Sequence, residues 1–156
     1  MKPVACLAAL AAVLPASSLA QTEKGSAQAA GASTVTITIT DLRNTKGVIR
    51  ACMTTNADIF PKCRKDPASH RTVVKAGESV KLRFEGVEPG RYAIALLHDE
   101  NDNGKADRAL LGMMPREGFG FSKDAPVRMG PPSFKDAAFD IAEDDAALTI
   151  RMRYML

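Results

Sequence analysis

The chain has 156 residues, a formal net charge of +3 at pH 7, 46% hydrophobic residues and no tryptophan. Its 21 basic and 18 acidic residues are interspersed along the sequence, which argues against a dedicated surface for nucleic acid or for acidic membranes. The length suits one domain with its own hydrophobic core, and nothing in the composition indicates a second domain.

Residues 1–20 have the pattern of a secretory signal peptide. Lys2 precedes an apolar run from Val4 to Leu14, and small residues complete the segment up to Ala20. Pro15 interrupts the run before it reaches the roughly 20 apolar residues that a membrane-spanning helix needs. We therefore expect cleavage after Ala20, a periplasmic or secreted protein, and no stable membrane insertion afterwards.

The remainder of the chain divides into a short tether and one domain. Residues 21–33 are small, polar and without hydrophobic periodicity, so we expect a flexible tether there. In residues 34–156 the dominant hydrophobic period is two, which is typical of half-buried strands. Seven segments have this period or the composition of a strand: 34–40, 46–54, 71–75, 80–85, 90–97, 136–142 and 148–154.

Turns rich in Gly, Pro, Asn and Asp separate these segments, and no segment has the periodicity of a helix of three turns. The pattern predicts an all-β fold, a single antiparallel β-sandwich of about seven strands with an immunoglobulin-like or transthyretin-like arrangement. The chain lacks the tryptophan and the widely spaced cysteine pair of an immunoglobulin domain. The segment VEPGRYAI, residues 87–94, resembles a turn-into-strand segment of transthyretin-like and carboxypeptidase-regulatory-like sandwiches.

Two cysteines follow the signal peptide, Cys52 and Cys63. Because export places them in an oxidising compartment, we expect a structural disulfide between them. Closing a loop of this length stabilises the fold by about 2–3 kcal/mol in chain-entropy terms. A redox pair or a metal–thiolate site is the alternative, but it would want a CxxC spacing or nearby histidines, and the sequence has neither.

The segment HDENDNGKAD, residues 98–107, has the spacing of a calcium-binding loop. Hard cations bind six to eight oxygens, which alternating short acidic and amide side chains supply from a tightly curved backbone. Gly104 stands where such a loop turns sharply. The ligands would be Asp99, Asn101, Asn103, the carbonyl of Lys105, and Asp107. The sequence therefore predicts a Ca²⁺ site, with a dissociation constant of about 10⁻⁴ to 10⁻³ M as in extracellular modules.

Two features separate this loop from the helix-loop-helix calcium motif. Leu110 stands where that motif has a bidentate glutamate, and the segment before the loop is a strand. The missing carboxylate would come from elsewhere, and the sequence leaves Glu117, Asp124 and Asp136 open as candidates. The alternative interpretation of the loop is a hairpin turn, since Asn-Gly tolerates positive φ and flanking acids are often only solvated.

His98 has the same parity as Tyr92, Ile94 and Leu96, so we expect it at the end of an inward-facing row. It either orients a carboxylate or ligates a transition metal, or it is simply hydrogen-bonded at the rim of the sandwich. We favour the hydrogen-bonded histidine. The other histidine, His70, stands in a polar stretch, and a zinc or copper site built on these two would lack its usual ligands.

Residues 112–134, GMMPREGFGFSKDAPVRMGPPSF, do not alternate, and their four glycines and four prolines exclude a regular helix or a central strand. Irregular segments of this length are usually functional or disordered, and three phenylalanines argue against disorder. We expect a ligand-contact surface formed by Phe119, Phe121, Ser122, Pro131, Pro132 and Phe134. The alternative is that the phenylalanines fold back as a small core over the open end of the sandwich.

Three motifs in combination resemble a bacterial family of exported proteins, domain of unknown function 2141. They are the acidic stretch 98–107, the GFGFS loop 118–122 and the GPPSFKDAAF segment 130–139. They occur in the order of the family, and with the surrounding strands the resemblance covers most of residues 34–154. The resemblance implies an exported β-sandwich without an established activity and transfers no catalytic residue. It suggests that the acidic loop and the Gly-Phe loop belong to one constellation.

Three hypotheses for function follow. The first is a non-enzymatic exported binding or interaction module, in which a calcium-stabilised acidic loop supports a contact surface for a protein, peptide or glycan. The second is a metal- or carboxylate-dependent hydrolase that uses Asp99, Asp102 and Asp107, assisted by His98. The third is an envelope accessory or structural protein whose strand at 34–42 pairs edge to edge with a partner. We favour the first, because the spacing suits a hard cation and no serine or cysteine nucleophile stands near a histidine in the sequence.

Overall fold

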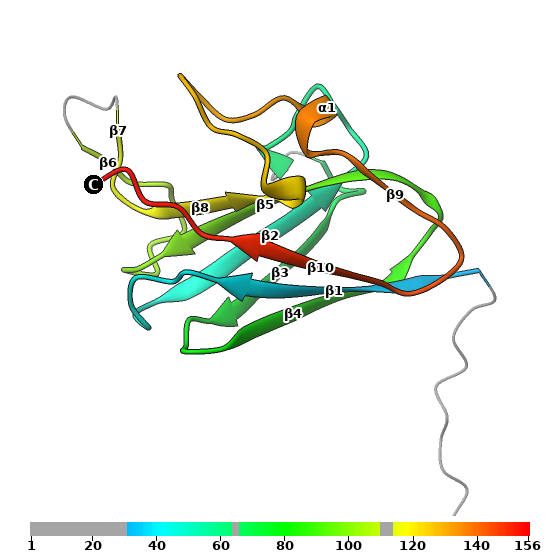
Figure 1. The fold of residues 1–156 in the computed structure, drawn as a ribbon, viewed down its shortest axis with the longest axis horizontal. Coiled ribbons are helices and arrows are strands. Elements are labelled where there is room, and N and C mark those ends of the chain that lie inside the picture. Colours follow the sequence, from blue (N-terminus) through cyan, green and yellow to red (C-terminus); the bar gives the residue numbers. More distant parts are fainter. Residues whose placement is uncertain (1–30, 64–65, 110–113) are drawn as a thin grey trace, which may run out of the picture.

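A computed structural model describes residues 31–63, 66–109 and 114–156. Two β-sheets pack against each other (Figure 1), which confirms the predicted all-β sandwich. The expected signal peptide and nearly all of the expected tether lie outside the described residues. The first strand begins at Ser33, one residue before the predicted start of the domain.

The smaller sheet has three strands in the order β10-β1-β4. Strand β1 (Ser33–Thr40) lies in the middle, antiparallel to β4 (Val80–Val87) and parallel to β10 (Ala146–Arg151). The parallel pair departs from the purely antiparallel sandwich that the sequence predicted. Because β1 has a neighbour on each side, the strand expected to pair edge to edge with a partner has no free edge to offer.

The larger sheet has the order β3-β2-β5-β8, and β9 pairs with the beginning of β5. A separate hairpin of two short strands stands between β5 and β8 in the chain. The helical segments of the described residues are single turns, and none of them is long or apolar enough to cross a membrane. The bounds are β2 Val48–Thr54, β3 His70–Lys75, β5 Gly90–Asp99, β6 Arg108–Ala109, β7 Met114–Pro115, β8 Gly118–Phe121, η2 Ser122–Asp124, α1 Phe134–Ala137 and β9 Phe139–Ile141.

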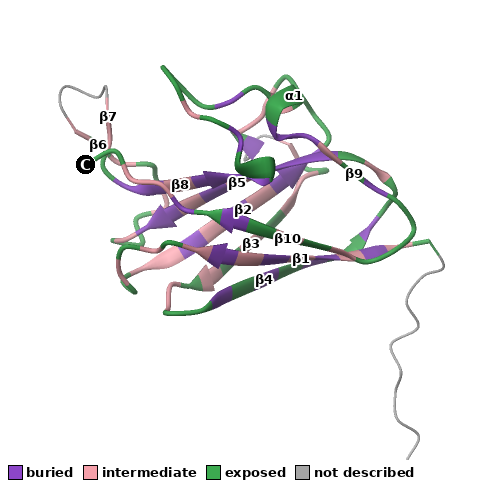
Figure 2. Cartoon of the chain, viewed as in Figure 1, coloured by how far each residue is buried: buried purple, intermediate pink, exposed green. Residues whose placement is uncertain are grey.

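The hydrophobic core lies between the two sheets, and buried residues alternate with more exposed ones along β1 and most of β4 (Figure 2). On β1 the fully buried Val35 and Ile37 alternate with half-buried threonines, and β2 and β5 contribute Ile49 and Ile94 from the opposite sheet. Burying a side chain of this size stabilises the fold by about 1.5–3 kcal/mol. The period-two pattern of the sequence is therefore what separates core from surface.

Residues 118–121 form strand β8, which corrects the prediction that this stretch does not alternate. The alternation is hidden because glycine occupies both inward positions. A Cβ on Gly118 would overlap the ring of Tyr154, and one on Gly120 would lie 2.9 Å from Ile150 Cγ2. Only glycine lets β8 cross so close to the C-terminal segment.

The predicted disulfide is confirmed. Cys52 on β2 is bonded to Cys63, and their Cα atoms are 6.1 Å apart. The bond ties the segment that follows β2 to the outer face of the larger sheet. Phe60, in this segment, packs edge-on against Phe121 and Phe134, with ring centroids 6.0 Å apart in both pairs.

Candidate cation site in the acidic loop

The acidic loop begins with a carboxylate that the fold itself uses. Asp99, the last residue of β5, has a fully buried side chain. Its Oδ2 accepts from Gly104 N at 2.8 Å and from Arg50 Nε at 2.6 Å, and its Oδ1 accepts from Asn103 N at 3.0 Å. Burial by itself would raise the pKa of Asp99, but Arg50 and the two backbone amides bring it below its ordinary value. Asp99 is therefore ionised at neutral pH and fixes the turn.

Arg50 is the residue of this loop that sequence reasoning missed. It lies on β2 opposite Leu97, and its Nη2 also reaches Asp102 Oδ1 at 2.6 Å. Asp102 and Gly104 have positive φ values of 52° and 76°, which Asp and Gly adopt at low cost. The position of Arg50 beside the loop depends on the pairing of β2 with β5, for which residues 48–54 contain no local signal.

Three side chains of the loop converge on one point. Asn101 Oδ1 accepts from Asn103 N at 3.2 Å, and Asn103 Oδ1 accepts from Lys105 N at 2.8 Å, so each asparagine closes a local turn. The amide nitrogens of Asn101 and Asn103 then donate to the same atom, Asp107 Oδ2, at 2.8 and 2.9 Å. Each amide oxygen accepts a single backbone hydrogen bond here and has a second lone pair. The loop therefore offers two amide oxygens and one carboxylate, which is a donor set that suits a hard cation.

Glu117 completes this cluster from the other side. It stands just before β8, and only 4% of its surface is exposed. Its Oε2 accepts from Asp107 N at 3.0 Å, whereas its buried Oε1 has no hydrogen-bond partner among the described residues. Burial raises the pKa of Glu117 and the charges of Asp99 and Asp107 raise it further, against hydrogen bonds from the backbone of Asp107 and Glu100 that lower it. A carboxylate oxygen that is buried without a partner, close to other carboxylates, is destabilised, and a bound cation would stabilise it.

The other two candidates for the completing carboxylate are engaged elsewhere. Asp124 pairs with Arg151 at 2.8 Å and with Arg153 at 2.7 Å. Asp136 accepts a hydrogen bond from Ser133 Oγ at 2.7 Å. Of the three residues that the sequence left open, the structure brings only Glu117 to the acidic loop.

The donor set of the loop is mixed. Within the described ranges, no three His, Cys, Asp or Glu side chains are grouped closely enough to hold a metal ion by themselves. Any cation here would therefore depend on amide and backbone oxygens as well as on carboxylates. An open depression of about 320 Å³ adjoins Asn101, Asp107 and Glu117, so the cluster has a route to solvent.

Positive side chains also line this depression. Arg43, Lys46 and Arg116 contribute to it. The charge of Arg43 is balanced, because its Nε pairs with Glu100 at 2.6 Å and its guanidinium lies 4.6 Å above the ring of Tyr154. The hydrogen bond to Glu100, against the effect of burial, raises the pKa of Arg43 above its ordinary value.

His98 is hydrogen-bonded at the rim, as we favoured from the sequence. Its side chain is fully buried, its Nε2 lies 2.8 Å from the carbonyl of Lys46, and its Nδ1 lies 2.7 Å from Tyr154 Oη. Nε2 must donate to the carbonyl, which leaves Nδ1 to accept from the tyrosine hydroxyl. The second histidine, His70, lies on β3 against the rings of Phe84 and Tyr92. His98 therefore joins the turn before β2 to the C-terminal segment.

The six residues expected to form a contact surface lie in two environments. Phe121 and Ser122 are buried, Phe119 and Phe134 are half-buried, Pro132 is buried, and only Pro131 is exposed. The three phenylalanines pack with Phe60, Ala93 and Ala137 in a second, smaller hydrophobic cluster on the outer face of the larger sheet. This arrangement matches the alternative interpretation, a small core formed by residues 118–137, which we call the Gly-Phe segment.

Ser122 has a structural hydrogen-bonding role. It is fully buried, donates from Oγ to the carbonyl of Ala137 at 2.6 Å, and accepts from Ile94 N at 2.9 Å. It thereby joins the α1 turn to β5 beneath the Gly-Phe segment.

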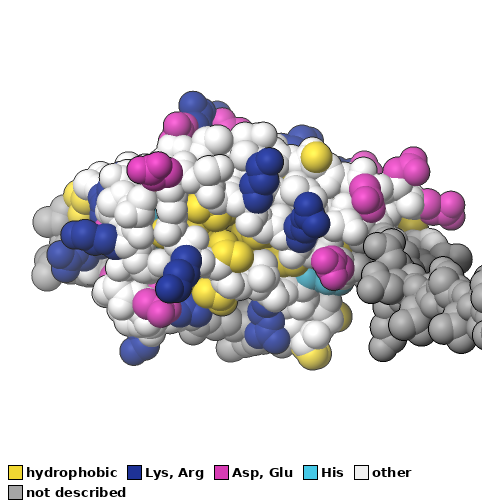
Figure 3. Space-filling view, turned by 90° about the horizontal axis from the view of Figure 1, so that it is seen from below, with side chains coloured by type: hydrophobic (Ala, Val, Ile, Leu, Met, Phe, Trp, Pro, Cys, Tyr) yellow, Lys and Arg dark blue, Asp and Glu magenta, His cyan; other side chains and the backbone are white. Residues whose placement is uncertain are grey.

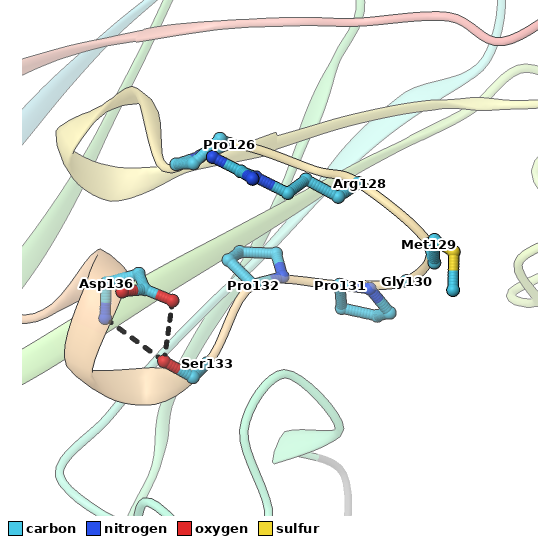
Figure 4. Close-up of a pocket in the computed structure, with 8 residues that line it drawn as sticks. All are labelled: Pro126, Arg128, Met129, Gly130, Pro131, Pro132, Ser133 and Asp136. Atoms are coloured by element: carbon cyan, nitrogen blue, oxygen red, sulfur yellow. Dashed lines mark hydrogen bonds between the residues drawn. The ribbon is translucent and has the colours of Figure 1, made fainter.

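Beyond this cluster, residues 126–136 form a shallow groove between two extended stretches of chain (Figure 4). Pro131 and Pro132 line one side, and Arg128 lies across from them. Met129, at the tip, is fully exposed.

The comparisons with known proteins identify a family for the chain. No curated protein and no solved structure matched the chain. The family model described as "Uncharacterized protein conserved in bacteria (DUF2141)" matches residues 37–149, which include both sheets, the acidic loop and the Gly-Phe segment. The chain therefore belongs to the DUF2141 family.

Proposed function

We propose that the protein is an exported, non-enzymatic binding module whose acidic loop holds a Ca²⁺ ion. The observation that carries the proposal is the buried Oε1 of Glu117, which has no hydrogen-bond partner in the described part of the chain and lies beside the point where Asn101, Asn103 and Asp107 converge. Calcium binds six to eight oxygens, including carboxylates, amide oxygens and backbone carbonyls. A bound ion would coordinate Glu117 Oε1 and reduce the repulsion between the carboxylates of Glu117 and Asp107.

The ion would bind a loop that is already formed. Asp99, through Arg50 and the two backbone amides, holds the turn in place, so binding does not have to order the backbone. The proposed ligands are the two asparagines, Asp107, Glu117 and the carbonyl of Lys105. With few full charges in this set, we expect the modest affinity of extracellular modules, a dissociation constant of about 10⁻⁴ to 10⁻³ M.

The hydrolase hypothesis has less support from the same geometry. General acid–base catalysis needs two carboxyl groups in different environments near open solvent. Asp99 and Asp102 instead share one guanidinium, that of Arg50, and the pKa of Asp99 is lowered. We therefore retain the non-enzymatic module as the proposed function.

The test is calcium titration of the purified protein by calorimetry, with Asp107→Asn and Glu117→Gln as variants. Each variant removes a charge and keeps the shape of the side chain, so the turn built on Asp99 should persist. Asp102→Asn is the matched control, because Asp102 is an exposed carboxylate of the same loop outside the converging set. We expect binding to the parent and to the control, and affinity reduced about tenfold or more in each of the other two.

The same proteins should be melted with and without calcium. The ion binds only the folded state, so the melting temperature should rise with calcium concentration in the parent and the control. A parent protein that shows neither heat of binding nor a shift in melting temperature would leave residues 98–107 as a hairpin turn and overturn the calcium proposal.

A further inference from the structure

Strands β3 and β4 form an open side of the sandwich. They are consecutive in the chain but end different sheets, and no strand of the described chain pairs with the outer edge of either. Figure 1 shows β4 along the lower border of the molecule, and Figure 3 is the view onto that border. The molecule therefore has two unpaired strand edges close together on one side.

The core is incompletely covered on this side. The inward-facing residues of β3, including Thr72 and Val74, are only half-buried, whereas their partners on β2, Ala51 and Ile49, are buried. Val73, on the outer face of β3, is 51% exposed. Figure 3 shows apolar surface here between Lys and Arg side chains. One more strand beside β3 would cover this apolar strip.

The rim of the strip is basic. Strand β3 contributes two exposed basic residues and no acid, and β4 contributes two exposed basic residues and one acid, Glu85. The four basic residues are Arg71, Lys75, Lys81 and Arg83. Charged residues on an edge strand commonly prevent two copies of a protein from pairing, because like charges would face each other. The same rim favours a strand of opposite charge.

We propose that the β3 edge accepts an extended segment of a partner protein in which apolar residues alternate with Asp or Glu. The backbone of the segment would pair with the free edge of β3, its apolar side chains would cover Thr72 and Val74, and its acids would face the basic rim. This inference names the partner class of the proposed binding module and so rests on that role, but it does not depend on the calcium ion.

The experiment uses a displayed library of short random peptides, selected on the immobilised purified protein. In parallel, the library is selected on Lys75→Glu/Lys81→Glu, which reverses two charges of the rim. Arg128→Glu/Lys135→Glu is the matched control, since it makes the same change in net charge at exposed residues near α1, on the other side of the molecule. Selected peptides are then synthesised, and their backbone contacts are mapped by amide chemical shifts.

We expect the parent and the control variant to enrich peptides that alternate apolar and acidic residues. Affinity for these peptides should fall about tenfold or more in the rim variant and with added salt, and the shifted amides should lie on β3. Enriched peptides that lack acids, that bind the rim variant equally well, or that shift amides elsewhere would overturn the edge assignment while the binding role stood. Enrichment of no peptide would overturn both, and calcium titration reports on the ion separately.

Discussion

The acidic loop, residues 98–107, and the Gly-Phe segment, residues 118–137, are the two most distinctive stretches of the chain. They differ in how fully their side chains find partners within the fold. In the Gly-Phe segment the phenylalanines pack on one another and on Phe60, and Ser122 makes hydrogen bonds to two other segments. In the acidic loop Asp99 is satisfied, but Glu117 beside it keeps a buried oxygen without a partner among the described residues.

This difference separates residues that build the fold from residues with capacity for a ligand. Apolar side chains that pack on one another have little exposed surface with which to contact a partner unless the segment opens. A buried carboxylate oxygen without a partner costs free energy, and such a cost is typical of functional sites. Substitutions in the Gly-Phe segment should therefore mainly lower the stability of the fold, whereas substitutions of Asp107 or Glu117 should mainly lower the affinity for calcium.

The largest effect on stability should come from Phe121→Ala. Phe121 is 5% exposed and contacts the rings of Phe60 and Phe119, so its removal leaves a cavity. We expect a loss of about 3–5 kcal/mol in the free energy of unfolding, measured by urea denaturation. Calcium affinity, measured where the variant is folded, should be unchanged. A loss below about 1 kcal/mol would mean that the Gly-Phe segment does not act as a small core.

Asp99→Asn should be the next largest, because it leaves Arg50 without its buried partner. We expect a loss of about 3 kcal/mol at pH 7. The pKa of Asp99 is lowered in the folded state, so its contribution is present above the unfolded pKa near 4 and is lost as pH falls toward the folded pKa. The difference in stability between parent and variant should therefore shrink below about pH 4. A difference that stayed constant down to pH 2 would contradict the role of the charge.

Gly118→Ala should cost about 1–3 kcal/mol, because the new Cβ meets the ring of Tyr154. Gly130→Ala is the matched control in the same segment, since nothing lies within 4 Å of a Cβ there. The control should change the free energy of unfolding by less than about 0.5 kcal/mol. Equal effects of the two substitutions, measured by thermal and urea unfolding, would argue against the close crossing of β8 over the C-terminal segment.

Glu117→Gln should have the smallest effect on stability and the opposite sign. Without calcium it should stabilise the fold at pH 7 by about 1 kcal/mol, because it replaces a buried, repelled carboxylate by a neutral group. The pKa of Glu117 is raised in the folded state, so protonation stabilises the parent as pH falls through that value. The advantage of the variant should accordingly disappear near pH 4. If the variant were less stable than the parent at every pH and still bound calcium, Glu117 would be a structural residue.

Much of the fold could be predicted from local pattern. Alternation identified three of the strands, at 34–40, 80–85 and 148–154, because period two directly reflects which side of a strand is buried. The other four segments were predicted from composition. In the one at 136–142 only Phe139–Ile141 form a strand, since residues 136 and 137 belong to the α1 turn. The cysteine pair, together with the expectation of export, predicted the disulfide between Cys52 and Cys63. Strand β8 escaped the analysis because its inward residues are glycines, which have no hydrophobic side chain to reveal the alternation.

The candidate site was predictable only in its contiguous part. The spacing from Asp99 to Asp107 lies within one loop and is visible in the sequence. Arg50 reaches the loop through the register of β2 with β5, and Glu117 reaches it through the return of the chain into β8. Neither placement has a local signal.

The sequence by itself determined which residues alternate, where the chain turns, and which loop has the ligand types for a hard cation, because these properties depend on neighbours a few positions away. Only the tertiary structure decided that Glu117, and neither Asp124 nor Asp136, adjoins that loop, that the phenylalanines lie against one another, and that β3 and β4 leave one side of the sandwich open. These features depend on strand pairing between distant segments, which local composition does not encode.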